Sequence, residues 1–137
     1  MLGIFVHGPW NATAREVGDP PPAILSADPN PQFGRAEEYV SLYGLARLLE
    51  QDTGPTFALY EHQADPPAGP APFEQLVEAA RGRFGWHVVV ELEPSMRVGV
   101  VGPQGDPDGW LETTDLDDAA YAIAQTSAWP EPRRPAP

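Results

Sequence analysis

The sequence predicts a two-layer α/β domain in which helices lie mainly on one face of a mixed four-stranded sheet. Short apolar segments alternate with amphipathic segments along the chain, which is typical of this class. The length of 137 residues fits one domain, and a hydrophobic content of 42% supports a core. We therefore assign residues 1–129 to a single α/β domain and 130–137 to a Pro-rich tail.

The first half of the chain contains one predicted strand and the strongest predicted helix. Residues 2–6 form a short apolar run bounded by glycines, which indicates a buried strand. Residues 8–34 contain six prolines and no period, and we weigh a turn of helix near 12–17 against a functional lid or a docking loop. Residues 35–51 repeat apolar side chains at steps of three and four, which predicts a helix.

The second half begins with a strand at 56–60 and a short helix at 73–81. Residues 86–93 and 96–101 follow as two strands joined by a tight hairpin turn.

Side-chain alternation sets the expected register of that hairpin. A three-residue turn at 94–96 would place Val90 opposite Val100 and Leu92 opposite Val98. It would also pair Glu93 with Arg97, which is a favourable cross-strand pair.

Thr114 is the expected start of the last helix, with Asp117 three residues later as in a capping box. The resulting order is β-α-β-α-β-β-α. Two right-handed crossovers would make the first three strands parallel, and the hairpin would add an antiparallel fourth.

The charge of the chain restricts its partners. The formal net charge is −12, and all eight basic residues are Arg. The absence of Lys, together with 18 Pro and 13 Gly, resembles the coding bias of a GC-rich bacterial genome. Phosphate backbones and anionic membranes would repel such a protein, so we expect neither direct nucleic-acid binding nor membrane binding. A basic protein partner would be attracted, although the same charge also serves solubility alone.

The sequence points to a cytoplasmic protein without a cofactor. The first residues lack the basic flank of a signal peptide, and no apolar run reaches the length of a membrane span. The absence of Cys excludes disulfides and thiolate metal sites. Residues 105–109 resemble a calcium loop only faintly and are better interpreted as a turn, so no metal site is predicted.

Three polar residues are the candidate catalytic group. His7 follows the first predicted strand, and Glu61 and His62 follow the second. If these strands are parallel neighbours, all three residues lie at the carboxyl edge of the sheet, where open α/β sheets place ligand sites. A His and a Glu can act as base and orienting group, yet polar residues at strand ends are also common without any function.

An acidic stretch is the candidate partner-binding surface. Between residues 91 and 118 there are eight acidic residues and one base, Arg97. A solvated surface would explain this pattern, and so would a surface that docks on a basic protein. Trp110 lies within the stretch and would be the apolar anchor, although such a Trp often folds back over the core. The expected partner-binding residues are Asp106, Asp108, Trp110, Glu112 and Asp115.

Two functional hypotheses follow. The first is a small acidic protein-binding domain that docks on a basic partner, as immunity proteins and antitoxins of nuclease toxins do; the analogy is one of size and charge. The alternative is a small hydrolase or ligand-binding protein that uses His7, Glu61 and His62. We prefer the first, because the chain contains no intact catalytic motif.

Overall fold

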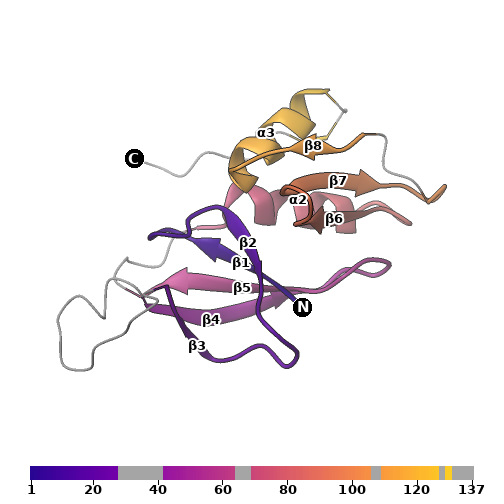
Figure 1. Ribbon diagram of the computed structural model, residues 1–137. Helices are drawn as coiled ribbons and strands as arrows, with labels where there is room; N and C mark the ends of the chain where they lie inside the picture. The colour runs from indigo at the N-terminus through magenta and orange to yellow at the C-terminus, as the bar shows by residue number, and fades with distance from the viewer. Residues whose placement is uncertain (28–41, 64–68, 106–108, 127–128, 131–137) are drawn as a thin grey trace, which may run out of the picture.

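The computed structural model describes residues 1–27, 42–63, 69–105, 109–126 and 129–130. They form a mixed α/β fold with a curled five-stranded sheet, a smaller three-stranded sheet and two helices (Figure 1). In chain order the elements are β1 (Leu2–Val6), β2 (Thr13–Glu16), β3 (Ile24–Ser26), β4 (Leu42–Leu49), β5 (Phe57–His62), α2 (Pro72–Arg81), β6 (His87–Glu91), β7 (Arg97–Val101), β8 (Leu111–Glu112) and α3 (Leu116–Thr126). No helix in the described ranges is long and apolar enough to cross a membrane.

The five-stranded sheet has the order β2-β1-β5-β4-β3. As the sequence predicts, the first strand and the strand near 56–60 are parallel neighbours, now β1 and β5. The predicted third parallel strand is wrong. Because β1 and β4 occupy both edges of β5, β6 pairs instead with β7, which also pairs with β8 in a separate antiparallel sheet.

The predicted helix at 35–51 is wrong over its described part, because Leu42–Leu49 is strand β4. A register shift between Leu45 and Arg47 interrupts the two-residue alternation of side chains. Because of this shift, apolar residues lie on both faces of β4. Their spacing in the sequence therefore resembles the three- and four-residue steps of a helix. Residues 35–41 lie outside the described ranges. The possible turn of helix near 12–17 is also wrong, because β2 covers Thr13–Glu16.

The hairpin forms as expected, but its register differs by two residues. Val90 pairs with Val98, and Glu91 pairs with Arg97. The connection therefore spans 92–96 and is longer than the tight turn predicted. A shift of two residues keeps every side chain on its expected face, so the valines remain on the buried side.

Helix α3 begins one residue later than expected. The Asp115 Oδ1 accepts hydrogen bonds from the backbone N–H groups of Asp117 and Asp118, at 2.9 and 3.0 Å. Asp115 is therefore the N-cap in place of Thr114, and the expected capping box with Asp117 does not form.

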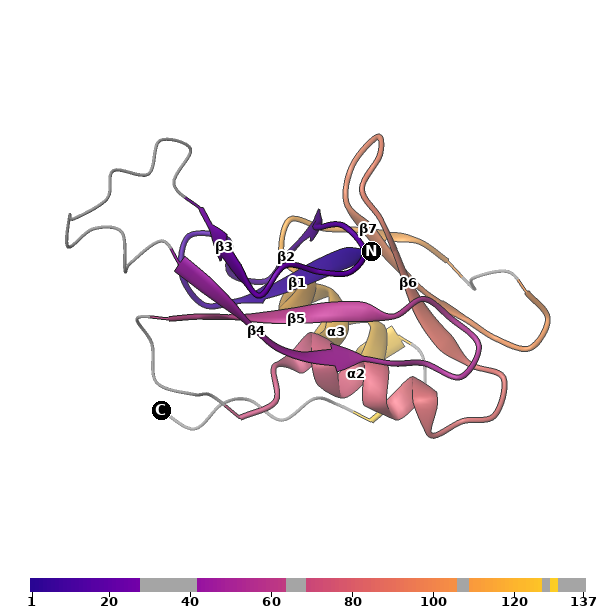
Figure 2. The same cartoon turned by 90° about the horizontal axis from the view of Figure 1, so that it is seen from below.

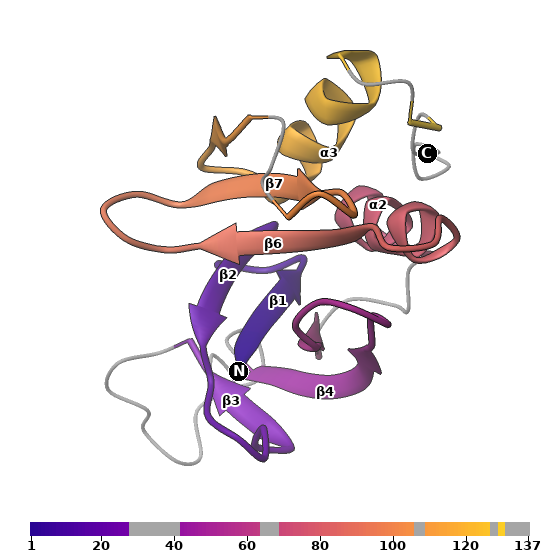
Figure 3. The ribbon, with the colours of Figure 1, turned by 90° about the vertical axis from the view of Figure 1, so that its right-hand side faces the viewer.

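The two helices and the small sheet lie on one side of the five-stranded sheet (Figures 1 and 2). The main core fills the space between them and includes Ile4, Leu59, Val77 and Ala120. Figure 3 shows the β6–β7 hairpin running past β1 and β2. The expectation of helices on mainly one face therefore holds for the larger sheet.

A separate aromatic cluster occupies the other face of the five-stranded sheet. Phe5, Tyr43 and Tyr60 are almost completely buried there, although no described helix covers this face. The ring of Phe5 stacks on Tyr60 at 5.2 Å and meets Tyr43 edge-on at 5.0 Å. Trp10 packs against this cluster, with its ring 5.0 Å from that of Phe5 and 5.7 Å from that of Tyr43.

Candidate functional site

The carboxyl ends of the two parallel strands meet at one edge of the five-stranded sheet. Val6 pairs with Glu61, and His7 follows Val6 directly. The topology thus places His7, Glu61 and His62 at the edge that the sequence indicates.

The side chains of Glu61 and His62 nevertheless point to opposite faces of the sheet, because they are consecutive residues of one strand. Glu61 lies on the face of Leu59, toward the main core. His62 lies on the face of Tyr60, is 7% exposed, and has its ring 5.2 Å from that of Tyr43. The catalytic role of these residues stays a prediction.

The chain leaves β1 through an unusual turn. His7 and Gly8 both have positive φ, 65° and 67°. The backbone N–H of His7 donates to Asn11 Oδ1 at 2.6 Å, which holds the turn closed. A Cβ at Gly8 would lie 2.5 Å from the His62 ring, so only glycine allows this close approach.

His7 lies close enough to Asp117, at the start of α3, for their charges to interact. Burial raises the pKa of the Asp117 carboxyl above its ordinary value of 3.8, and the charges of Asp115 and Asp118 add to this rise. A hydrogen bond from the Phe73 N–H, at 3.3 Å, and the charge of His7 act in the opposite direction.

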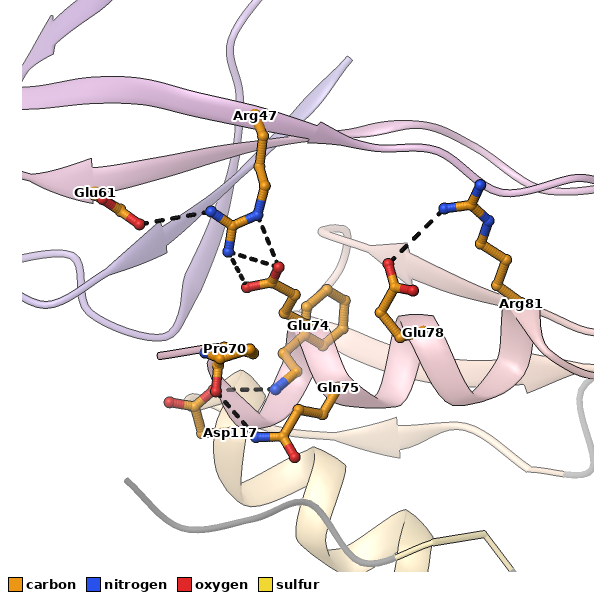
Figure 4. Close-up of polar contacts among 9 residues, drawn as sticks. Arg47, Glu61, Pro70, Glu74, Gln75, Glu78, Arg81 and Asp117 are labelled. Carbon is orange, nitrogen blue, oxygen red and sulfur yellow. Dashed lines mark hydrogen bonds and ion pairs between the residues drawn. The ribbon is translucent and has the colours of Figure 1, made fainter. Parts of the chain in front are cut away.

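Arg47 connects the sheet to helix α2 (Figure 4). Its Nε donates to Glu74 Oε2 at 2.8 Å, and a second guanidinium nitrogen lies 2.6 Å from Oε1. A longer contact of 3.7 Å joins Arg47 to Glu61. Because the Glu61 carboxylate faces this guanidinium, its clearest role in the described structure is an ion pair between β4 and β5.

Of the five expected partner-binding residues, the structure describes three. Trp110 precedes β8, and the Arg97 guanidinium lies 4.4 Å from its ring centroid. Glu112 is exposed and stands opposite Arg97 in the β7–β8 pairing. Asp115 is the α3 N-cap. Asp106 and Asp108 lie outside the described ranges.

A cavity of about 460 Å³ opens between the small sheet and α3, and we call it the tryptophan cavity. The Trp86 and Trp129 rings meet edge-on at 5.4 Å, and Trp110 completes the aromatic lining. The remaining lining residues are Val100, Gly109, Leu111, Ala122, Ile123 and Thr126. Aromatic walls of this kind are typical of sites that accept an anchoring side chain.

Three carboxylates lie in or directly before the elements that line this cavity, and we call them the acidic rim: Glu112, Asp115 and Asp118. Glu112 directly follows Leu111 of the lining, so its side chain leaves the other face of β8. Asp118 lies one helical turn before Ala122, on the same stripe of α3 that lines the cavity. Within the described ranges, no arginine forms an ion pair with Glu112 or Asp118.

The described arginines are instead engaged elsewhere. Each one contacts a carboxylate or the face of a tryptophan: Arg15 on Trp10, Arg47 on Glu61 and Glu74, Arg81 on Glu78, Arg83 on Trp129 and Arg97 on Glu91 and Trp110. Of the three rim residues, Glu112 and Asp118 are exposed, whereas Asp115 is half-buried at the start of α3.

The sequence indicated part of this surface and missed the rest. Trp110 and Glu112 are among the expected residues, whereas the contribution of Trp86 was not foreseen. Trp129 is 7% exposed and belongs to the main core, as expected of a Trp that folds back. The cavity forms because residues 86, 110 and 129 converge in three dimensions, and no local spacing signals this.

Among the described residues, no three His, Asp or Glu side chains gather in a way that could hold a metal ion. A scan against protein-family models gave no match, and searches of curated proteins and of solved structures gave no significant match.

Proposed function

We propose that this chain is a protein-binding domain that docks on a basic partner through the tryptophan cavity and its acidic rim. The observation that carries the proposal is an open aromatic cavity whose lining elements, β8 and α3, also carry exposed carboxylates, Glu112 and Asp118, that no described arginine pairs with. An inhibitor of a basic enzyme would be one form of such a domain.

The cavity and the rim would contribute differently to binding. An apolar or cationic side chain of the partner, desolvated against Trp110, would supply most of the affinity. The rim charges would act mainly on the association rate and on the choice of partner, because exposed charges are screened and hydrated. The net charge of −12 supports a basic protein over nucleic acid or an anionic membrane.

A small hydrolase or ligand-binding protein is the second candidate. The observation in its favour is His7, which has a positive φ and lies near the carboxyl of Asp117. We rank it lower, because Glu61 faces Arg47 and His62 is buried in the aromatic face.

A comparison of baits tests the proposal. The wild-type chain is used to capture proteins from a lysate beside a rim variant, Glu112→Gln with Asp118→Asn. The matched control, Glu50→Gln with Asp19→Asn, removes the same charges from exposed positions that do not line the cavity. We expect a basic protein on the wild-type and control baits that the rim variant retains much less. Equal capture by all three baits would contradict the assigned surface.

A further inference from the structure

The segment that follows α2 exposes an aromatic side chain completely. Phe84 is 100% exposed. Ile24 and Leu48 are also large exposed apolar residues, but their exposed fractions are lower. Leaving a Phe in water forgoes the stabilisation that its burial would supply. An exposed aromatic residue at a turn is therefore a candidate contact for another molecule.

Phe84 borders the tryptophan cavity. Arg83, the residue before it, places its guanidinium 3.8 Å from the centroid of the Trp129 ring. Trp86, two residues after Phe84, lines the cavity itself. The protruding aromatic side chain thus belongs to the same short segment, residues 83–86, that contacts Trp129 and lines the cavity.

The arginines nearest to Phe84 already have partners within the molecule. Arg81 lies 3.9 Å from Glu78, and the Arg83 guanidinium lies over the Trp129 ring. The self-complementarity therefore lies in shape: a two-fold rotation would bring the Phe84 of each molecule to the cavity of the other, as a symmetric dimer interface requires.

We propose that this surface binds a second copy of the chain, with Phe84 of each molecule entering the tryptophan cavity of the other. A cavity of about 460 Å³ has room for one phenylalanine side chain. Insertion would cover the two apolar features that the single molecule leaves open. This inference goes beyond the proposed function: a basic partner would compete with the second copy for the cavity.

Salt distinguishes the two associations. Two molecules of net charge −12 repel each other, so screening should strengthen the dimer. Binding to a basic partner is attractive over long range, so screening should weaken it. The two equilibria should therefore respond to salt in opposite directions.

Sedimentation velocity tests the inference with the chain alone. We expect a reversible monomer–dimer equilibrium with a Kd on the order of 10 µM, since the interface is small. The Kd should fall as ionic strength rises from about 0.05 to 0.5 M. Phe84→Ser should weaken the dimer about a hundredfold, since each dimer loses two buried rings at about tenfold each.

The control is Ile24→Ser, which removes an exposed apolar side chain, 64% exposed, from β3. This variant should dimerise like the wild type. A chain that stays monomeric up to about 1 mM would overturn the inference. A dimer whose Kd is unchanged by Phe84→Ser would overturn it as well. Both results would leave the docking of a basic partner intact, so the two proposals fail separately.

Discussion

The side chain of Gln51 forms hydrogen bonds with the β6 backbone that a neighbouring strand would otherwise form. Its side-chain amide accepts from the Val88 N–H at 2.7 Å and donates to the Val88 carbonyl at 2.9 Å. It also donates to the Pro55 carbonyl at 2.9 Å. One buried side chain therefore satisfies backbone groups at the edge of the small sheet and ties it to the loop before β5.

Replacing this amide by a carboxylate should destabilise the fold. Gln51→Glu keeps the acceptor for Val88 but removes both donors, and it buries a negative charge beside two carbonyl oxygens. We expect the free energy of unfolding to fall by about 2–4 kcal/mol at pH 7. Urea unfolding followed by tryptophan fluorescence measures this change. The exposed neighbour serves as control, since Glu50→Gln should stay within about 0.5 kcal/mol of wild type.

The raised pKa of Asp117 predicts that the stability of the fold depends on pH. Burial raises the pKa of its carboxyl above 3.8 in the folded state. Between pH 3.8 and the raised pKa, the folded state binds more protons at this carboxyl than the unfolded state does. The free energy of unfolding therefore decreases as pH rises through that window. Asp117→Asn should therefore gain stability relative to wild type at neutral pH, and lose this advantage below the window. Thermal unfolding from pH 3 to 7 tests the sign; a variant less stable than wild type only at neutral pH would contradict it.

At the scale of elements, the Arg47–Glu74 pair holds α2 against β4. The Glu74 side chain is only 8% exposed, whereas that of Arg47 is 43% exposed. Removing the cation would strand a buried carboxylate, so Arg47→Met should cost about 2–4 kcal/mol in the free energy of unfolding. Glu74→Gln in the same chain should recover part of this loss, because the uncompensated charge is then gone.

The exposed pair on the same helix is the matched control for this cycle. Arg81 and Glu78 lie 3.9 Å apart with roughly half of each side chain in solvent. Arg81→Met should change stability by less than about 0.5 kcal/mol. Similar losses for Arg47→Met and Arg81→Met would contradict the view that burial decides the effect.

The elements also show where sequence reasoning succeeded. Residues 2–6 and 73–81 have a single interpretation. The first is a continuous apolar run that is buried on both faces of a strand, and the second repeats apolar residues along one face of a helix. Residues 42–49 do not, since the shift near Ala46 exposes apolar side chains on both faces of the strand. Gly44, in the middle of the expected helix, was the available warning, because glycine disfavours a helix interior. The hairpin faces were correct because a two-residue slip preserves them.

At the scale of the whole molecule, the sequence located one edge and missed the architecture around it. The parallel pairing of β1 and β5 is as expected, but its expected basis is wrong: in place of a crossover helix at 35–51, the described chain between them forms β2, β3 and β4. The structure instead pairs β4 with the second edge of β5, and β6 joins a separate sheet. Which strand pairs with that edge depends on contacts between residues far apart in the sequence. In the same way, Trp110 and Glu112 could be selected from charge and position, whereas the cavity they border depends on the packing of α3 over the small sheet.

We expect the cavity and the acidic rim to affect different rate constants of binding. Trp110→Ala should mainly raise the dissociation rate of the complex, because it removes part of the cavity wall. The rim variant should instead lower the association rate. Surface-bound kinetics with the basic protein captured by the bait comparison would measure both rates, and a Trp110→Ala effect confined to association would contradict this division.

The dependence of the association rate on ionic strength tests the central claim most directly. The wild-type chain should bind this partner fastest at low salt and lose that advantage as salt rises. Glu112→Gln with Asp118→Asn should slow association about two- to fivefold at low salt and flatten the salt dependence, while Glu50→Gln with Asp19→Asn should leave the rate close to wild type. An association rate that is insensitive to salt, or equally changed by the rim and control variants, would contradict docking through the acidic rim.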